Sequence, residues 1–172
     1  MFGRIKARFE SMGTIKALSE AAEQFARQDQ QREPGAEHFL LAALALPDST
    51  ARLAFEAIGA DADAVGPAIA RQYGEALKAV GLDPAFADQA GEPEPLPTPR
   101  AVFDAAPSGK EVMQRLAGER QSHSPLVGAH VVAVIAAMPH GVAARALRVM
   151  KIDAEALQAA AERIARERTA SR

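Results

Sequence analysis

Two apolar segments that begin in the same way constrain the fold more than any other feature of the chain. "GAEHFLLAAL" covers residues 35–44 and "VGAHVVAVIA" covers residues 127–136, and each places a histidine, His38 or His130, directly before an apolar run. The two histidines are 92 residues apart (130 − 38), which is too far for local periodicity and suits a duplicated unit. The same shift places Pro47 on Pro139, so each segment is followed by a proline. The sequence therefore predicts an internal repeat.

Strong helix formers dominate the rest of the chain. Ala, Leu, Arg, Glu and Gln recur, Trp is absent, and 5% of the residues are aromatic. The spacing of apolar residues and the positions of helix-breaking residues predict eight helices. These cover 14–30, a segment from about 36, 50–58, 64–80, 108–121, 128–138, 142–150 and 154–168. We expect an all-α fold, an eight-helix bundle of two four-helix repeats packed about a pseudo-twofold axis.

The proline pattern predicts how the two repeats are joined. Residues 81–100 contain five prolines, four of which alternate with other residues, and this favours an extended backbone over a helix. We expect one domain over 1–172, with repeat one at about 14–80, a linker at 81–100 and repeat two at about 101–168. The linker is interpreted as a connection, with a docking peptide for a partner groove as the alternative.

Composition excludes several classes of function. The chain has no Cys, which rules out disulfides, thiolate zinc sites and a cysteine nucleophile. A net charge of −2 gives no general attraction to nucleic acid or anionic lipid, and no apolar run reaches the ~18 residues that span a bilayer. The first residues lack the apolar core of a secretory signal, so we expect a cytoplasmic location. No catalytic motif, cofactor motif or metal-ligand spacing is found, so the protein is expected not to be an enzyme and to hold no metal or cofactor.

The order and spacing of four short motifs resemble a known family. "MFGR" (1–4), "GAEHFLLAAL", "TPRA" (98–101) and "HGVAARALRVMKID" (140–153) are similar to the N-terminal domain of the Clp ATPases, closest to the ClpC type. The resemblance implies the double Clp-N motif, an eight-helix bundle ahead of AAA+ rings that binds adaptors and receives substrates. No G-x-x-x-x-G-K-[ST] motif occurs, since "SGKE" (108–111) has Glu111 at the hydroxyl position, so we expect a free-standing Clp N-domain without AAA+ modules.

The resemblance also implies a candidate binding residue. ClpC-type domains recognise phosphoarginine through one glutamate per repeat, and the matching positions are Glu37 and Ala129. A carboxylate for the guanidinium and helix N-terminal amides for the phosphoryl group remain together only in the first repeat, so weakened, single-site or absent binding is expected. In "AAPSGKE" (105–111), Pro107 and Gly109 are expected to break a helix that the family keeps uninterrupted.

Each candidate also has a structural interpretation. Glu37 is either a ligand carboxylate or an acidic residue favoured in the first turn of a helix. His38 and His130 are interpreted as structural imidazoles that bond to a loop or helix end, with a metal role as the alternative. The leading function is a non-enzymatic module for a peptide, client, adaptor or Clp ATPase. The alternative is a structural or regulatory partner that acts through a stable dimer or complex, and the sequence leaves the oligomeric state open.

Overall fold

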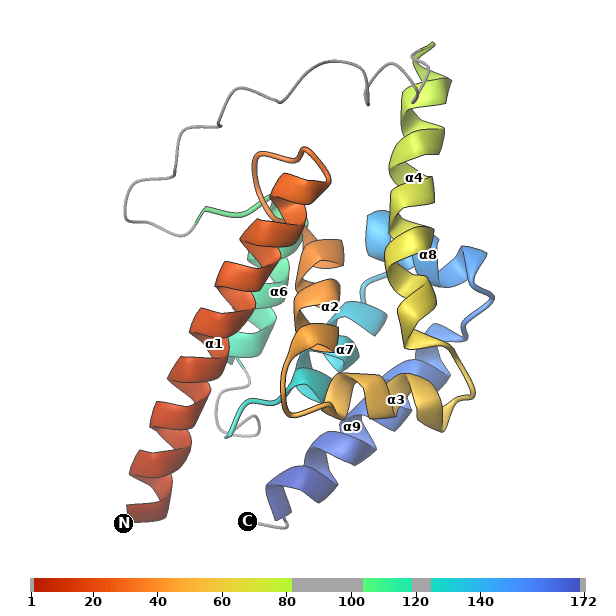
Figure 1. The fold of residues 1–172 in the computed structure, drawn as a ribbon. Coiled ribbons are helices and arrows are strands. Elements are labelled where there is room, and N and C mark those ends of the chain that lie inside the picture. The colour runs from red at the N-terminus through yellow and green to blue at the C-terminus, as the bar shows by residue number, and fades with distance from the viewer. Residues whose placement is uncertain (1, 82–103, 119–124, 171–172) are drawn as a thin grey trace.

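The computed structural model describes residues 2–81, 104–118 and 125–170, with side chains described from residue 10 onward. In these ranges the chain forms eight α-helices, one short 310 turn and no strand, which confirms the predicted all-α class (Figure 1). The helices are α1 (Phe2–Gln28), α2 (Ala36–Ala45), α3 (Thr50–Ala57), α4 (Val65–Ala79), α6 (Pro107–Gly118), α7 (Gly128–Ala136), α8 (Val142–Val149) and α9 (Ala154–Ala170), and the 310 turn η1 is Ala62–Ala64. None of the described helices is both long and apolar enough to cross a membrane.

The first helix begins twelve residues earlier than the predicted start at Thr14. Gly13 lies inside α1, and an added Cβ would meet nothing there within 4 Å. A single glycine in an exposed helix costs about 1 kcal/mol but does not end the helix, so the prediction was wrong at this boundary. At the other end, Gln30 has a left-handed backbone (φ 56°), and the helix ends two residues before it.

The buried face of α1 is the one that its periodicity predicts. Leu18, Ala22 and Ala26 are buried, and Ile15 and Phe25 are partly buried. These positions recur every three or four residues, which places them on one side of a helix. This face packs against α2.

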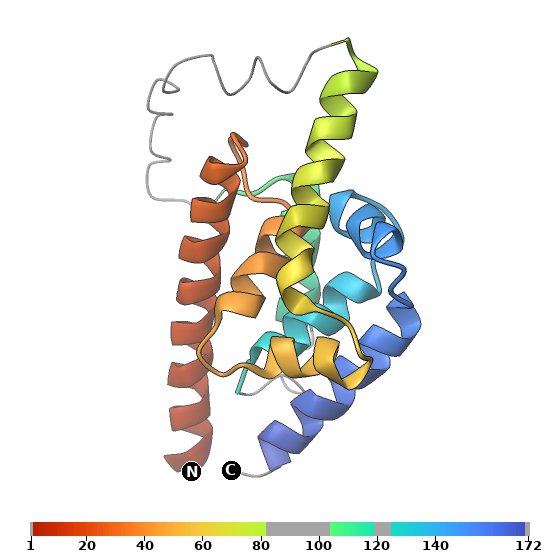
Figure 2. The same cartoon turned by 45° about the vertical axis from the view of Figure 1, so that its right-hand side comes forward.

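Helices α2 and α7 form the centre of the bundle. Both are apolar almost all round, and the structure buries every described residue of α7 and all but two of α2. Figures 1 and 2 show the remaining helices arranged around this pair, with α1 on one side and α4 and α8 on the other. Contacts cross between the two halves, since α3 packs against α9 and α4 packs against α8. The two-repeat organisation nevertheless stays a prediction.

Helix α6 corrects the expected break at Gly109, whereas residues 104–106 before Pro107 are not helical. Pro107 is the first residue of α6, a position where a proline's missing N–H costs no helical hydrogen bond. Gly109 lies inside α6 and is buried. An added Cβ at this position would collide with the Pro34 carbonyl and come within 3.2 Å of Phe39. The glycine therefore allows α6 to pack closely against the start of α2. The predicted linker from residue 82 onward and the predicted helix end at residue 121 lie outside the described residues.

Candidate functional site

The two histidines occupy the same position at the start of the two central helices. His38 Nδ1 accepts a hydrogen bond from the Gly35 backbone N–H at 2.9 Å, and His130 Nδ1 accepts one from the Val127 backbone N–H at 3.1 Å. Each imidazole thus satisfies an N–H just before its own helix, a group that the helix cannot pair internally. Both rings are buried, with exposed fractions of 0% and 5%. Pro47 and Pro139 lie two and three residues beyond the last residues of α2 and α7.

His38 has additional neighbours from the turn after α1 and from α4. Because its Nδ1 accepts a hydrogen bond, the neutral ring carries its hydrogen on Nε2. That nitrogen lies 3.3 Å from Asp29 Oδ2 but makes no aligned hydrogen bond. The ring is also stacked on Tyr73, with 6.2 Å between the ring centroids and 15° between the planes. The region around His38 is therefore more polar than a simple helix cap requires.

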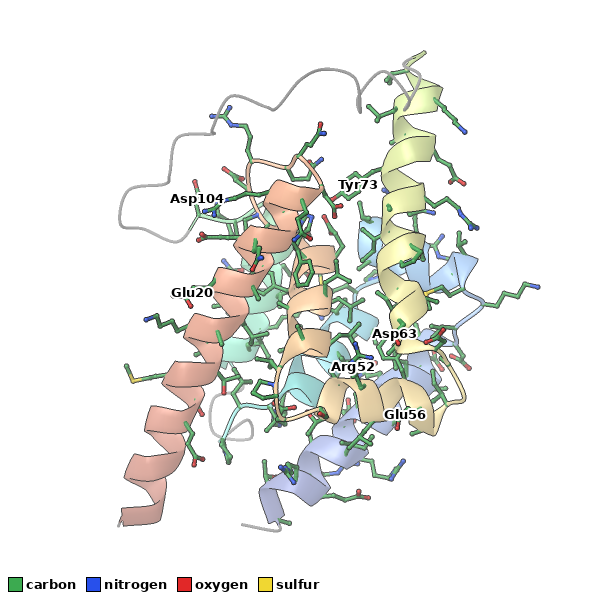
Figure 3. All side chains as sticks on the ribbon, in the orientation of Figure 1. Glu20, Arg52, Glu56, Asp63, Tyr73 and Asp104 are labelled. Carbon is green, nitrogen blue, oxygen red and sulfur yellow. The ribbon has the colours of Figure 1, made fainter. Side chains whose placement is uncertain are left out.

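Glu37 lies in the same cluster, and its carboxylate is buried. The Tyr73 hydroxyl donates to Glu37 Oε1 at 2.6 Å, and the Glu37 side chain is 7% exposed. The carboxylate folds back over Gly35, where an added Cβ would collide with it. Figure 3 shows Tyr73 extending from α4 toward the first turn of α2. Glu37 is thus held between α2 and α4 and is not displayed on the surface.

Tyr73 was not among the residues that the sequence singled out. It is the one tyrosine of the chain and lies 36 positions after Glu37, so no local spacing links the two. Burial raises the pKa of Tyr73 well above its ordinary value, and the hydrogen bond to Glu37 and the charges of Glu37 and Asp29 raise this pKa further. The phenol therefore stays protonated, which lets it act as the donor to the carboxylate.

The equivalent surface of α7 is organised differently. Asp48 Oδ2 accepts from the Gly128 backbone N–H at 3.0 Å, and Thr50 Oγ1 accepts from the Ala129 backbone N–H at 2.8 Å. Thr50 in turn donates its hydroxyl to Asp48 Oδ1 at 2.6 Å. The first amides of α7 are therefore bonded to a carboxylate and a hydroxyl from the first half of the chain. This arrangement leaves Ala129 with neither a carboxylate nor an unpaired backbone N–H.

The start of α2 has a simpler partner from the second half. The Ala36 backbone N–H donates to Ser108 Oγ at 3.1 Å, and the Ala106 backbone N–H donates to the Pro34 carbonyl at 3.1 Å. Each central helix is thus capped by a segment from the other half of the chain. The first turn of α2 thus contains an acidic residue of its own, Glu37, whereas the first turn of α7 contains none and meets the Asp48 carboxylate from the first half of the chain.

A separate pocket of about 380 Å³ lies between α6, α7 and α9. Its lining combines small apolar residues of α7 and α9 with charged and polar residues, among them Arg115 from α6 and Arg166 from α9. His130 and Ala165 both line it. This pocket was not predicted, because its residues come from three helices and no sequence spacing connects α6 with α9.

The described residues offer no group for metal chemistry. Nowhere in them do three or more His, Asp or Glu side chains come together in a way that could hold a metal ion. His123 lies outside the described residues. The acidic and histidine side chains at the start of α2 are instead bonded to Tyr73 and to the backbone.

A comparison with protein families identifies the fold. The family model for the Clp repeat N-terminal domain matches residues 14–115, which include α1 from Thr14, the Glu37–His38 step and most of α6. "MFGR" and "HGVAARALRVMKID" lie outside the matched residues. No curated protein sequence matches the chain. Because the match covers more than half of the 172 residues, the chain belongs to the Clp repeat N-terminal domain family, whose domains are typically protein-interaction modules.

Proposed function

We propose that this chain is a non-enzymatic protein- or peptide-binding module that delivers adaptors or client proteins to a Clp unfoldase–protease, or modulates that machine, in the cytoplasm. The observation that carries the proposal is the family match over residues 14–115. The sequence contains no phosphate-binding G-x-x-x-x-G-K-[ST] motif, so the 172 residues have no ATPase chemistry of that kind to contribute. Binding is then the property through which the module acts.

The Glu37 cluster is the proposed ligand-recognition point at α2. A buried carboxylate that keeps a tyrosine hydroxyl as its partner can exchange that partner for a guanidinium, which forms stronger charge-assisted hydrogen bonds. Such an exchange requires the Tyr73 side chain to turn away from α2. The closed arrangement supports weak binding of phosphoarginine at one site, with the α2 carboxylate as the guanidinium partner.

Two matched variants test this role. Glu37→Gln removes the charge with little change in shape, whereas Tyr73→Phe removes the competing hydroxyl and leaves the carboxylate in place. In calorimetric titration with free phosphoarginine, we expect Glu37→Gln to abolish binding and Tyr73→Phe to tighten it several-fold. Glu56→Gln, on the exposed side of α3 (Figure 3), is the control and leaves binding unchanged. Equal binding by the wild type and Glu37→Gln would assign Glu37 a structural role alone.

The wider function is tested by affinity capture from lysate of the source organism. The full chain is immobilised beside Glu37→Gln and Glu56→Gln, and bound proteins are quantified by mass spectrometry. Recovery of a Clp ATPase, its protease or an adaptor is the expected result. Absence of these proteins, together with a concentration-independent dimer in light scattering, would contradict the proposal and favour a structural partner protein.

A further inference from the structure

The pocket between α6, α7 and α9 has an apolar floor and a basic rim. Ala133 and Val134 of α7, Ala137 directly after α7 and Ala165 of α9 supply small aliphatic surfaces. Arg115 of α6 and Arg166 of α9 line the same pocket from different helices. Ligand sites typically combine such apolar walls with a few polar groups that orient the ligand, and their volumes start at about 300 Å³. The pocket's 380 Å³ is close to that lower limit, which suits one or two amino-acid residues.

A comparison with the other half of the chain explains why this space exists. His38 is stacked on Tyr73 of α4, and the residues 92 positions later are His130 and Ala165. Both of these line the pocket. Where a tyrosine ring covers the first histidine, an alanine methyl group lies beside the second. Position 165 therefore lacks the large ring that position 73 supplies in the first half, and the pocket extends to this position.

The charges of the pocket favour an anion. Glu162 is the acidic residue of the lining, and it is already engaged, because Gln158 Nε2 donates to it at 2.9 Å and Arg166 lies 3.9 Å from it. Arg115 pairs with Glu111 one turn earlier on α6, at 2.6 Å. Both arginine pairs are between exposed side chains four residues apart, and such pairs are weak. An incoming carboxylate can therefore replace the glutamate partner and accept hydrogen bonds from either guanidinium.

We propose that this pocket binds the free carboxyl terminus of a peptide whose last residue is aliphatic. The terminal carboxylate would bind Arg115 and Arg166, and the aliphatic side chain would lie on the alanine and valine floor. An acidic side chain within a peptide would supply the charge without the apolar body, so the combination of rim and floor selects a chain end. This inference rests on the proposed protein-binding function and names the chemistry of the bound segment.

Fluorescence anisotropy with the full chain and two defined peptides tests the proposal. The probe is a fluorescein-labelled octapeptide that ends in Val-Leu with a free carboxylate, and its partner is the same peptide with a terminal amide. We expect the amide to bind at least tenfold more weakly, because it loses the charge that the two guanidinium groups recognise. Equal affinity for the two peptides, or no binding of either, would overturn the proposal.

Variants on α9 locate the site. Arg166→Gln should weaken the free-acid peptide about tenfold, and Ala165→Tyr should block binding by filling the space beside His130. Arg163→Gln is the matched control, since Arg163 is exposed on the same helix, pairs with Glu167 and does not line the pocket. It should change the affinity less than twofold. If Arg163→Gln and Arg166→Gln have the same effect, the binding is general charge attraction and the pocket proposal fails.

Two further measurements keep the outcome unambiguous. Circular dichroism checks that Ala165→Tyr is folded, and the exposed Arg166→Gln substitution carries the test if it is not. Competition with hexanoate distinguishes a peptide from a small aliphatic acid, and equal competition by hexanoate would contradict a peptide site. If Ala165→Tyr fails to affect peptide binding but still captures Clp proteins, the pocket proposal is wrong while the proposed function remains.

Discussion

The starts of α2 and α7 share a backbone arrangement and differ in the side chains built on it. In both helices a buried imidazole accepts a hydrogen bond from the backbone N–H three residues before it. At α2 this cap carries a glutamate and a tyrosine that fill the space toward α4, whereas both corresponding positions at α7 are alanines. The packing follows: α9 lies closely along α7, while α4 contacts α2 sparingly and extends beyond it (Figure 2). The start of α2 therefore meets α4 through a hydrogen-bonded polar pair, whereas α7 and α9 have alanines at both corresponding positions.

The largest expected effect comes from removing the histidines that the two halves share. His38→Ala should lower the free energy of unfolding by about 3 kcal/mol, because it removes a fully buried ring, its cap hydrogen bond and its stacking on Tyr73. His130→Ala should cost about 2 kcal/mol, because it removes a buried ring and its cap hydrogen bond at the edge of a pocket. Urea unfolding followed by circular dichroism measures both. Equal losses in the free energy of unfolding would show that the different surroundings of the two rings do not affect stability.

The next effect comes from the cross-half cap of α7. Asp48→Ala should cost about 2 kcal/mol, because it leaves the Gly128 N–H and the Thr50 hydroxyl without their acceptor. The residue 92 positions later is His140, which is exposed, so His140→Ala should change stability by less than about 0.5 kcal/mol. Thermal unfolding of the two variants gives the contrast directly. Similar melting temperatures would mean that Asp48 is dispensable as a cap.

A smaller effect appears at alkaline pH. The pKa of Tyr73 in the folded protein lies above its ordinary value of 10, so the folded state retains this proton more firmly than the unfolded state. The resulting stability is fully present below pH 10 and decreases as the pH rises above it. By pH 11 the wild type should lose about 1 kcal/mol relative to Tyr73→Phe, a figure reduced for the partial exposure of the ring.

Two measurements check this pH effect. Absorbance at 295 nm reports the phenolate of the chain's one tyrosine, and its midpoint should lie above pH 10 in the folded protein. Urea unfolding at pH 8 and pH 11 compares the wild type with Tyr73→Phe, so that lysine and arginine titration cancels. A midpoint at or below pH 10 would contradict the buried hydrogen bond between Tyr73 and Glu37.

The smallest effect concerns the cap of α2. Ser108→Ala removes the hydroxyl that accepts from the Ala36 N–H, and the expected cost is about 1 kcal/mol or less, because a neutral hydrogen bond is lost at a partly buried site. The same unfolding measurement places it beside Asp48→Ala. A loss as large as that of Asp48→Ala would reverse the expected ranking of the two caps.

Local patterns predicted much of the fold. The helical periodicity of residues 14–28 identified the buried face of α1, and the continuous apolar character of 36–45 and 128–136 identified the two central helices. The predicted helix start at Thr14 and the expected break at Gly109 were wrong, whereas the non-helical residues 104–106 agree with a break before Pro107. Gly109 disfavours a helix by about 1 kcal/mol in an exposed position, but here it lies inside α6 where a larger residue would collide with the Pro34 carbonyl. The size of that penalty depends on contacts that the sequence does not display.

The candidate site likewise combines features that follow from the sequence alone with features that depend on the tertiary structure. The sequence alone determined that the chain is helical, that His38 and His130 begin two equivalent apolar helices, and that Glu37 has no carboxylate counterpart at position 129, because these are properties of residue type and spacing. Only the tertiary structure decided that Tyr73 covers Glu37, that Asp48 and Thr50 occupy the amides of α7, and that a pocket opens beside His130. Each of these depends on helices that are distant in sequence and are brought together by burial of their apolar faces, and that burial fixes which polar groups meet.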